Sequence, residues 1–126
     1  TSPVKRGTWI LKTLLGTDPG LPVANAGEIA PKVPGIDKAT VRKRLEIHRE
    51  LPQCARCHSK IDPLGFALEN YNAAGEWRLQ EGFGYKGRIE RDDPVIDASS
   101  RMPDGREIDG VRGLQEALLA RDGLFL

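Results

Sequence analysis

The pattern of apolar and polar positions predicts a short helix near the start of the chain, over residues 5–15. Apolar positions recur there at near-helical spacing, and Gly16 follows in the position of a C-terminal cap. From Gly16 to Gly35 the chain has little periodicity and many prolines. We therefore expect residues 1–36 to form a helix followed by an irregular, Pro/Gly-rich arm. The recurring positions of the helix are Trp9, Ile10, Thr13 and Leu14.

A second helix is predicted over residues 37–51, because apolar positions follow one another there at i, i+4 and i+7. Asp37 or Thr40 is expected to cap its start, and Pro52 is expected to end it. His48 shares the apolar face of this helix, so its imidazole is expected to point toward the interior. The apolar stripe consists of Val41, Leu45 and His48, flanked by Ile47 and Leu51.

The second half of the chain predicts two more helices and little else that is regular. Asp62 followed by Pro63 is the signature of an N-cap and a first-turn proline, so a third helix is predicted over residues 63–71. A last helix is predicted over residues 110–122. Residues 74–108 are rich in glycine and charge, with two strand-like pairs that would form at most a short hairpin. These pairs are Val95–Ile96 and Glu107–Ile108, and the apolar face of the last helix comprises Val111, Leu114, Leu118 and Leu119.

The predicted fold is therefore one mostly α domain over residues 1–126, with its core in residues 37–126, long irregular loops and at most a short β-hairpin. Composition changes this picture in one respect. Hydrophobic residues make up 39% of the chain and aromatic residues only 6%. A core so poor in aromatic side chains indicates a domain that is completed by a large apolar cofactor.

Charge and hydropathy exclude several classes of partner. The formal net charge is +1, and basic and acidic residues are interspersed, so the sequence predicts no nucleic-acid partner. No apolar run reaches the length of a membrane span, and no signal peptide opens the chain. We interpret the chain as an excised domain or mature fragment, and the missing signal then carries no information about the compartment.

Both cysteines of the chain lie in one short motif, Cys54-Ala55-Arg56-Cys57-His58. A zinc site would combine this motif with His48, but the adjacent Cys57 and His58 reach one tetrahedral ion only with distortion, and a distant ligand pair is absent. A redox dithiol or disulfide needs only the two cysteines. Thioredoxin-like proteins, however, place that motif after a strand, and here a helix precedes it.

Attachment of a c-type haem uses every fixed residue of the motif. The thiols of Cys54 and Cys57 would add to the porphyrin vinyl groups, and His58 would bind the iron as the proximal ligand. We therefore predict one haem c, covalently bound through Cys54 and Cys57. This cofactor also fits the aromatic-poor core.

The ligand on the other side of the iron separates an electron carrier from a haem that binds small molecules. His48 lies on the apolar face of the helix that leads into the motif. Met102 lies in a Met-Pro segment, as in the layout of a small class I cytochrome, and a thioether ligand would raise the reduction potential. His48, Met102 and an open or water-bound site all remain candidates.

Other residues are expected to form the surroundings of the haem. Leu64 and Phe66, with Leu68, would line the pocket, although core packing explains them equally well. Trp77 and Arg78 are candidates for binding the haem propionates, because a guanidinium group suits carboxylates. A packing tryptophan and a surface arginine are the alternative interpretation.

Four stretches of the chain resemble the cytochrome-associated domains of unknown function found in large exported proteins of planctomycetes and related bacteria. The resemblance implies a periplasmic or exported c-type cytochrome domain, usually one module of a longer polypeptide. It supplies no reaction, and it implies that related domains often have leucine in place of Met102. The stretches are "TSPVKRGTWIL" (1–11), "HRELPQCARCHSKIDPLGFALENY" (48–71), "AGEWR" (74–78) and "VIDASSRMPDGREIDG" (95–110).

Residues and resemblance together predict a c-type cytochrome domain that carries single electrons, and they favour an electron carrier over an enzyme. Its partner is expected to be another domain of the same polypeptide or a periplasmic redox protein. Two alternatives remain. One is a haem enzyme or gas sensor with an open distal site, and the other is a structural zinc module.

Overall fold

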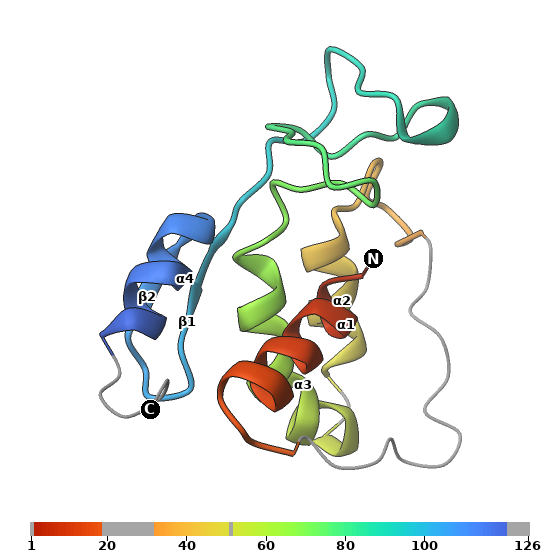
Figure 1. Ribbon diagram of the computed structural model, residues 1–126. Helices are drawn as coiled ribbons and strands as arrows, with labels where there is room; N and C mark the ends of the chain where they lie inside the picture. The colour runs from red at the N-terminus through yellow and green to blue at the C-terminus, as the bar shows by residue number, and fades with distance from the viewer. Residues whose placement is uncertain (1, 19–31, 51, 121–126) are drawn as a thin grey trace.

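The computed structural model describes residues 2–18, 32–50 and 52–120 (Figure 1). Within these ranges it has four α-helices, a short π-helix, a single 3-10 turn and a two-stranded antiparallel sheet. The prediction of a mostly α domain with at most a short hairpin is confirmed. Most of the predicted Pro/Gly-rich arm lies outside the described residues.

The first helix, α1 (Pro3–Trp9), continues directly into the π-helix η1 (Ile10–Leu14). It starts earlier than predicted because the Ser2 side chain accepts a hydrogen bond from the Lys5 N–H and Pro3 occupies the first helical position. Gly16 adopts a left-handed φ of 67° just after η1, as expected of a helix-ending glycine. The buried face is formed by Ile10 and Leu11, and Trp9 is exposed, contrary to the predicted stripe.

The second helix, α2 (Val41–His48), is capped by Thr40, whose hydroxyl accepts from the Lys43 N–H. The prediction of Thr40 as cap is confirmed, and the alternative start at Asp37 is wrong. Lys38 explains the later start, because it has a left-handed φ of 52° that interrupts helical geometry between the two candidates. Leu45 is completely buried on the inner face of α2.

The third helix, α3 (Pro52–Phe66), corrects the prediction that a new helix begins at Asp62-Pro63. The helix starts at Pro52, runs through the whole Cys/His motif and contains Pro63 in its interior. Asp62 therefore caps nothing. Its carboxylate contacts the His58 side chain one turn earlier in the same helix. It therefore does not cap a helix as the local Asp-Pro sequence predicted.

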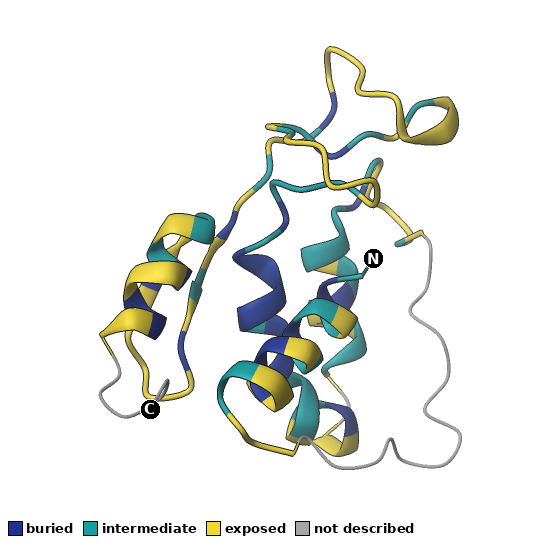
Figure 2. Ribbon diagram, viewed as in Figure 1, coloured by how far each residue is buried: buried dark blue, intermediate teal, exposed yellow. Residues whose placement is uncertain are grey.

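Helices α1 and α3 cross with their backbones in direct contact, at two glycines (Figure 1). A Cβ atom on Gly7 would overlap the Ile61 carbonyl, and a Cβ atom on Gly65 would overlap the Pro3 carbonyl. This close crossing fixes α3, and with it the Cys/His motif, against the start of the chain. Figure 2 shows that the buried residues of the domain concentrate on α3 and on the helix sides that face it.

The hairpin pairs β1 (Ser99–Arg101) with β2 (Glu107–Asp109), with Ser100 opposite Ile108. The second predicted strand is confirmed, but the first is wrong. Val95 instead forms an isolated bridge with Gln80 and leaves its side chain exposed, so it lies in the loop that reaches the hairpin. This loop also contains the 3-10 turn η2 (Tyr85–Gly87) and is largely exposed at the top of Figure 2.

The last helix, α4 (Gly110–Leu119), follows β2 without a break and packs on the hairpin. Leu114 and Leu118 of the predicted face are buried, and Leu119 is exposed. One hydrophobic cluster joins these residues to η1 and α3. Its buried members are Ile10, Leu11, Ile61, Leu64, Ala67, Met102, Ile108, Leu114, Ala117 and Leu118.

None of the helices in the described part of the chain combines the length and the apolar composition that a bilayer crossing requires.

Candidate functional site

Helix α3 carries the three chemically reactive side chains of the motif. Because Cys54 and Cys57 are separated by three positions, their thiols lie about one helical turn apart on the same side of α3. Cys54 is buried, with 5% of its surface exposed, and Cys57 is half-buried against the hydrophobic cluster. The side chain of His58 is 19% exposed. The helix thus presents two thiols and one imidazole within a single stretch.

The imidazole of His58 is held by Asp62, one turn further along α3. Nδ1 of His58 lies 3.0 Å from Oδ1 and 3.1 Å from Oδ2 of Asp62. When the carboxylate is ionised it only accepts hydrogen bonds, so Nδ1 then carries the proton and donates it. In that tautomer Nε2 has its lone pair available, which is the arrangement found in metal-binding histidines.

Asp62 is completely buried, and its protonation is set by opposing influences. Burial raises its pKa above the ordinary aspartate value, while the hydrogen bond with His58 and the charge of Arg49 lower it. The Arg49 Nε lies 3.9 Å from Oδ2 of Asp62. The carboxylate therefore sits between two potential cations in a water-poor environment.

His48 lies next to His58, as the last residue of α2. The centroids of the two imidazole rings are 5.2 Å apart, and the ring planes are nearly perpendicular, at 77°. The structure thus brings together two histidines that lie ten positions apart in the sequence. Of the two sequence candidates for a second axial ligand, His48 is the one next to His58.

Met102 lies elsewhere. It follows β1, is buried in the hydrophobic cluster and lines a pocket beside Lys60 and Pro63. Lys60 follows His58 by two positions and Pro63 by five, which correspond to about 200° and about 140° of helix rotation. Met102 therefore packs against a different side of α3 from the one that carries His58.

The predicted pocket walls, Leu64 and Phe66, are buried on two different sides of α3. Leu64 belongs to the hydrophobic cluster. The ring of Phe66 is covered by Arg42 of α2, whose guanidinium carbon is 4.2 Å from the ring centroid. Leu68 packs at the edge of the cluster.

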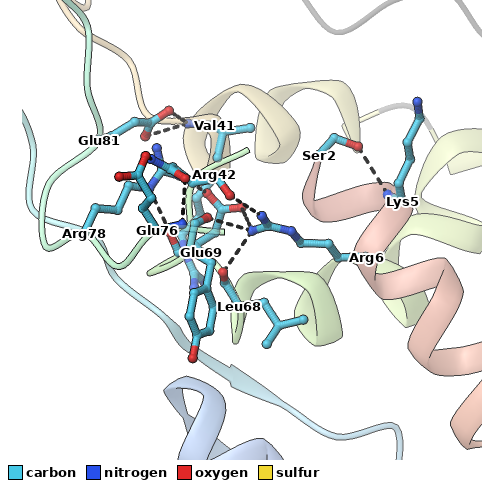
Figure 3. A network of polar contacts seen from close by, with 12 residues as sticks. Ser2, Lys5, Arg6, Val41, Arg42, Leu68, Glu69, Glu76, Arg78 and Glu81 are labelled. Atoms are coloured by element: carbon cyan, nitrogen blue, oxygen red, sulfur yellow. Dashed lines mark hydrogen bonds and ion pairs between the residues drawn. The ribbon is translucent and has the colours of Figure 1, made fainter. Parts of the chain in front are cut away.

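Arg78, a predicted propionate partner, is engaged with the chain itself (Figure 3). Its Nη2 lies 3.1 Å from Oε2 of Glu69, and its Nε donates to the Glu69 carbonyl at 3.0 Å. Trp77 is 57% exposed and stands edge-on to Tyr71, with ring centroids 5.4 Å apart. Arg78 therefore neutralises a buried carboxylate in this structure, and Trp77 packs on a tyrosine.

Two buried glutamates in Figure 3 were not anticipated from the sequence. Glu69 lies between Arg78 and Arg6, and Arg6 also donates to the carbonyls of Leu68, Tyr71 and Asn72. Glu81 accepts from the Val41 N–H at 3.0 Å and so satisfies the first turn of α2. Burial raises the pKa of Glu69 and of Glu81, and the neighbouring arginines oppose that rise.

The Asp62 partner of His58 was also missed. The only signal in the sequence is the spacing of four between the two residues, and this spacing is meaningful only if one helix runs through both. The local Asp-Pro signature predicted a helix boundary between them and concealed the pair.

Across residues 2–18, 32–50 and 52–120, no group of three or more His, Cys, Asp and Glu side chains is arranged to hold a metal ion. Hence the zinc alternative has no ready ligand set in these ranges. The donors that do converge are the imidazoles of His48 and His58, close to the thiols on α3.

Comparison with known proteins gives one match. The family named PSCyt3, described as a protein of unknown function (DUF1588), matches residues 1–81. No curated protein and no solved structure matches the chain. The match includes the first three of the four stretches noted above but not residues 95–110, and the name of the family suggests a relation to cytochromes. The chain belongs to the PSCyt3 (DUF1588) family.

Proposed function

We propose that this chain is a c-type cytochrome domain that carries single electrons through one covalently bound haem. The observation that carries the proposal is the pairing of His58 with His48, 5.2 Å apart, beside two thiols on the same helix as His58. The donor set fits haem c, because it offers two thiols for attachment and imidazoles for the iron. When bound, the haem supplies an iron that alternates between the ferrous and ferric states.

In this proposal each residue of the motif has one task. Cys54 and Cys57 would hold the porphyrin by thioether bonds, and His58 would present Nε2 to the iron because Asp62 occupies its Nδ1. His48, whose ring lies next to that of His58, would supply a second imidazole to the iron. The buried Leu64 and Phe66 limit access of water to this region of α3.

Two imidazole ligands leave no position for a small molecule, and this favours electron transfer over catalysis. The electron partner is then a redox protein or a neighbouring domain of the same polypeptide. We further propose that the domain lies in the periplasm or in an exported protein, as its resemblance to exported cytochrome-associated domains implies.

The proposal is tested by producing the chain with a haem-maturation system and measuring its absorption spectrum in both oxidation states. We expect haem that remains bound after denaturation and acid–acetone extraction, and a low-spin spectrum. Cys54→Ala combined with Cys57→Ala should abolish covalent retention. A colourless protein that holds stoichiometric zinc would overturn the proposal.

The axial ligand is tested by comparing His48→Ala with Met102→Leu, a substitution that conserves volume in the core. We expect His48→Ala to convert the low-spin spectrum to high spin and to allow carbon monoxide to bind the reduced protein. Met102→Leu should leave the spectrum unchanged. The opposite result would assign the ligand to Met102, and rapid carbon monoxide binding by the unmodified protein would indicate an open site.

A further inference from the structure

The carboxylate of Asp62 orients His58 but would itself bind neither the porphyrin nor the iron, although it is among the most deeply buried groups in the domain. It lies in the interior of α3, so it caps no helix. Among the described residues its polar contacts are with His58 at 3.0 Å and with Arg49 at 3.9 Å. A buried acid is costly unless it is paired, so its position calls for a function of the pair.

Burial strengthens the contact between Asp62 and His58. With little water nearby, the hydrogen bond is electrostatically stronger than it would be at the surface. The spacing of four positions on a continuous helix fixes the carboxylate beside the ring edge that carries Nδ1. The ring can then neither flip nor change tautomer without losing this bond.

We propose that Asp62 positions His58 and gives its imidazole partial anionic character, and that it thereby lowers the reduction potential of the haem. The inference rests on the proposed function, since it requires His58 to bind iron. A ligating histidine that donates its second N–H to a carboxylate becomes a more basic ligand. A more basic ligand, and a fixed negative charge nearby, stabilise the ferric state more than the ferrous state.

The haem would take up one electron from a reducing partner, with no bond made or broken. Asp62 would act on this equilibrium by placing a buried negative charge beside His58. That charge would disfavour the added electron and so lower the reduction potential. Arg49 balances part of the charge and limits the effect.

The test compares the midpoint potential of the haem-loaded protein with that of Asp62→Asn, which keeps the shape of the side chain but removes its charge. We expect the ferrous form to be favoured about tenfold, an increase of about 59 mV for one electron. Glu46→Gln is the control, because it removes the same charge from the exposed face of α2, where the side chain of Glu46 is 46% exposed. Equal shifts in the two variants would overturn the inference.

A second measurement needs no variant. In the reduced unmodified protein, the Nδ1 proton of His58 should exchange slowly with water and show a nuclear Overhauser effect to the Asp62 Cβ protons. Absence of that effect would overturn the inference even if Asp62→Asn fails to fold. Unmodified protein that carries no covalent haem would refute the proposed function, whereas haem-loaded protein with no specific Asp62 effect would refute only this inference.

Discussion

At the scale of single residues, the domain buries four carboxylates within its described part. Each buried acid is close to at least one basic side chain, and the four groups involve different segments of the chain. They are Asp62 with Arg49 and His58, Glu69 with Arg78 and Arg6, Glu81 with Arg44, and Asp93 with Lys38. Breaking such a pair leaves a buried charge without its partner, which is more costly than losing a surface ion pair.

The Asp93 pair gives a prediction about pH. The Lys38 ammonium, 2.8 Å from Asp93, together with the N–H groups of Glu90 and Phe83, lowers the pKa of Asp93 below its ordinary value of 3.8. A lowered pKa in the folded state means stability that is present above the unfolded pKa and is lost as the pH falls through the folded pKa. Asp93→Asn should therefore be less stable than the unmodified protein at neutral pH, and this difference should shrink below about pH 3.8.

Urea unfolding of both proteins, followed by circular dichroism at neutral and acidic pH, measures this difference in unfolding free energy. The exposed neighbour Asp92 also contacts Lys38, so Asp92→Asn serves as the matched control, with a smaller effect expected. A difference between Asp93→Asn and the unmodified protein that persists or grows in acid would contradict the prediction.

Single residues also show which parts of the site could be predicted from the sequence alone. The two thiols and His58 were identified from their spacing, because that chemistry is encoded in five consecutive residues. The partners of the buried acids were not identified, because Arg6 and Glu69, for example, are distant in sequence and meet only after α1 and α3 have crossed. His48 was identified as a candidate because it lies on an apolar helix face near the motif.

At the scale of secondary-structure elements, the crossing of α1 over α3 depends on the absence of a side chain at Gly65. We expect Gly65→Ala to destabilise the fold by about 1–3 kcal/mol, because a Cβ atom there would meet the Pro3 backbone, which cannot move aside. Gly113→Ala is the control in α4, where the added Cβ would be 3.4 Å from Ile108. It should be neutral or stabilise by up to about 1 kcal/mol, because alanine is the better helix former.

Thermal or denaturant unfolding of the two glycine variants separates these effects. If both variants were equally stable, the close backbone contact between α1 and α3 would not contribute to stability.

Some of the helices and strands were predicted correctly and others were not. Helix α2 and its Thr40 cap followed from local signals, because the cap and the buried Leu45 are encoded within a few residues. The predicted end at Pro52 was too late, since α2 ends at His48. The start of α3 was wrong because the Asp-Pro signature is equally local, and the contact that overrides it involves a side chain of the preceding turn. The first hairpin strand was wrong because neither candidate had a strong strand pattern, and register was decided by packing of Ile108 into the core.

At the scale of the whole molecule, the hydrophobic cluster joins the start of the chain to its last described helix. Ile10 and Leu11 belong to the part that matches the family, whereas Leu114 and Leu118 lie beyond residue 81. The C-terminal hairpin and α4 therefore complete a core that the matched residues begin. Figure 1 shows this arrangement, with α4 and the hairpin on one side of α3 and α2 on the other.

Because α4 shares this hydrophobic cluster, we expect it to contribute to the stability of the entire domain. Leu114→Ala should lower the unfolding free energy by about 2–5 kcal/mol, because it leaves a cavity between α4 and the rest of the cluster. Leu119→Ala, in the same helix at a position that is 75% exposed, should have little effect. Urea unfolding monitored by circular dichroism measures both, and a small effect of Leu114→Ala on a single cooperative transition would show that α4 is only loosely attached.

The burial of Cys54 has a consequence for the order of events during biogenesis. A thiol with 5% of its surface exposed cannot meet a porphyrin vinyl group supplied from solution. On the proposed function, thioether formation at Cys54 must therefore precede the final packing of α3, while the motif is still accessible to the attachment machinery. Covalent modification and folding then compete during maturation. Mutations that slow folding would therefore increase the yield of haem-loaded protein.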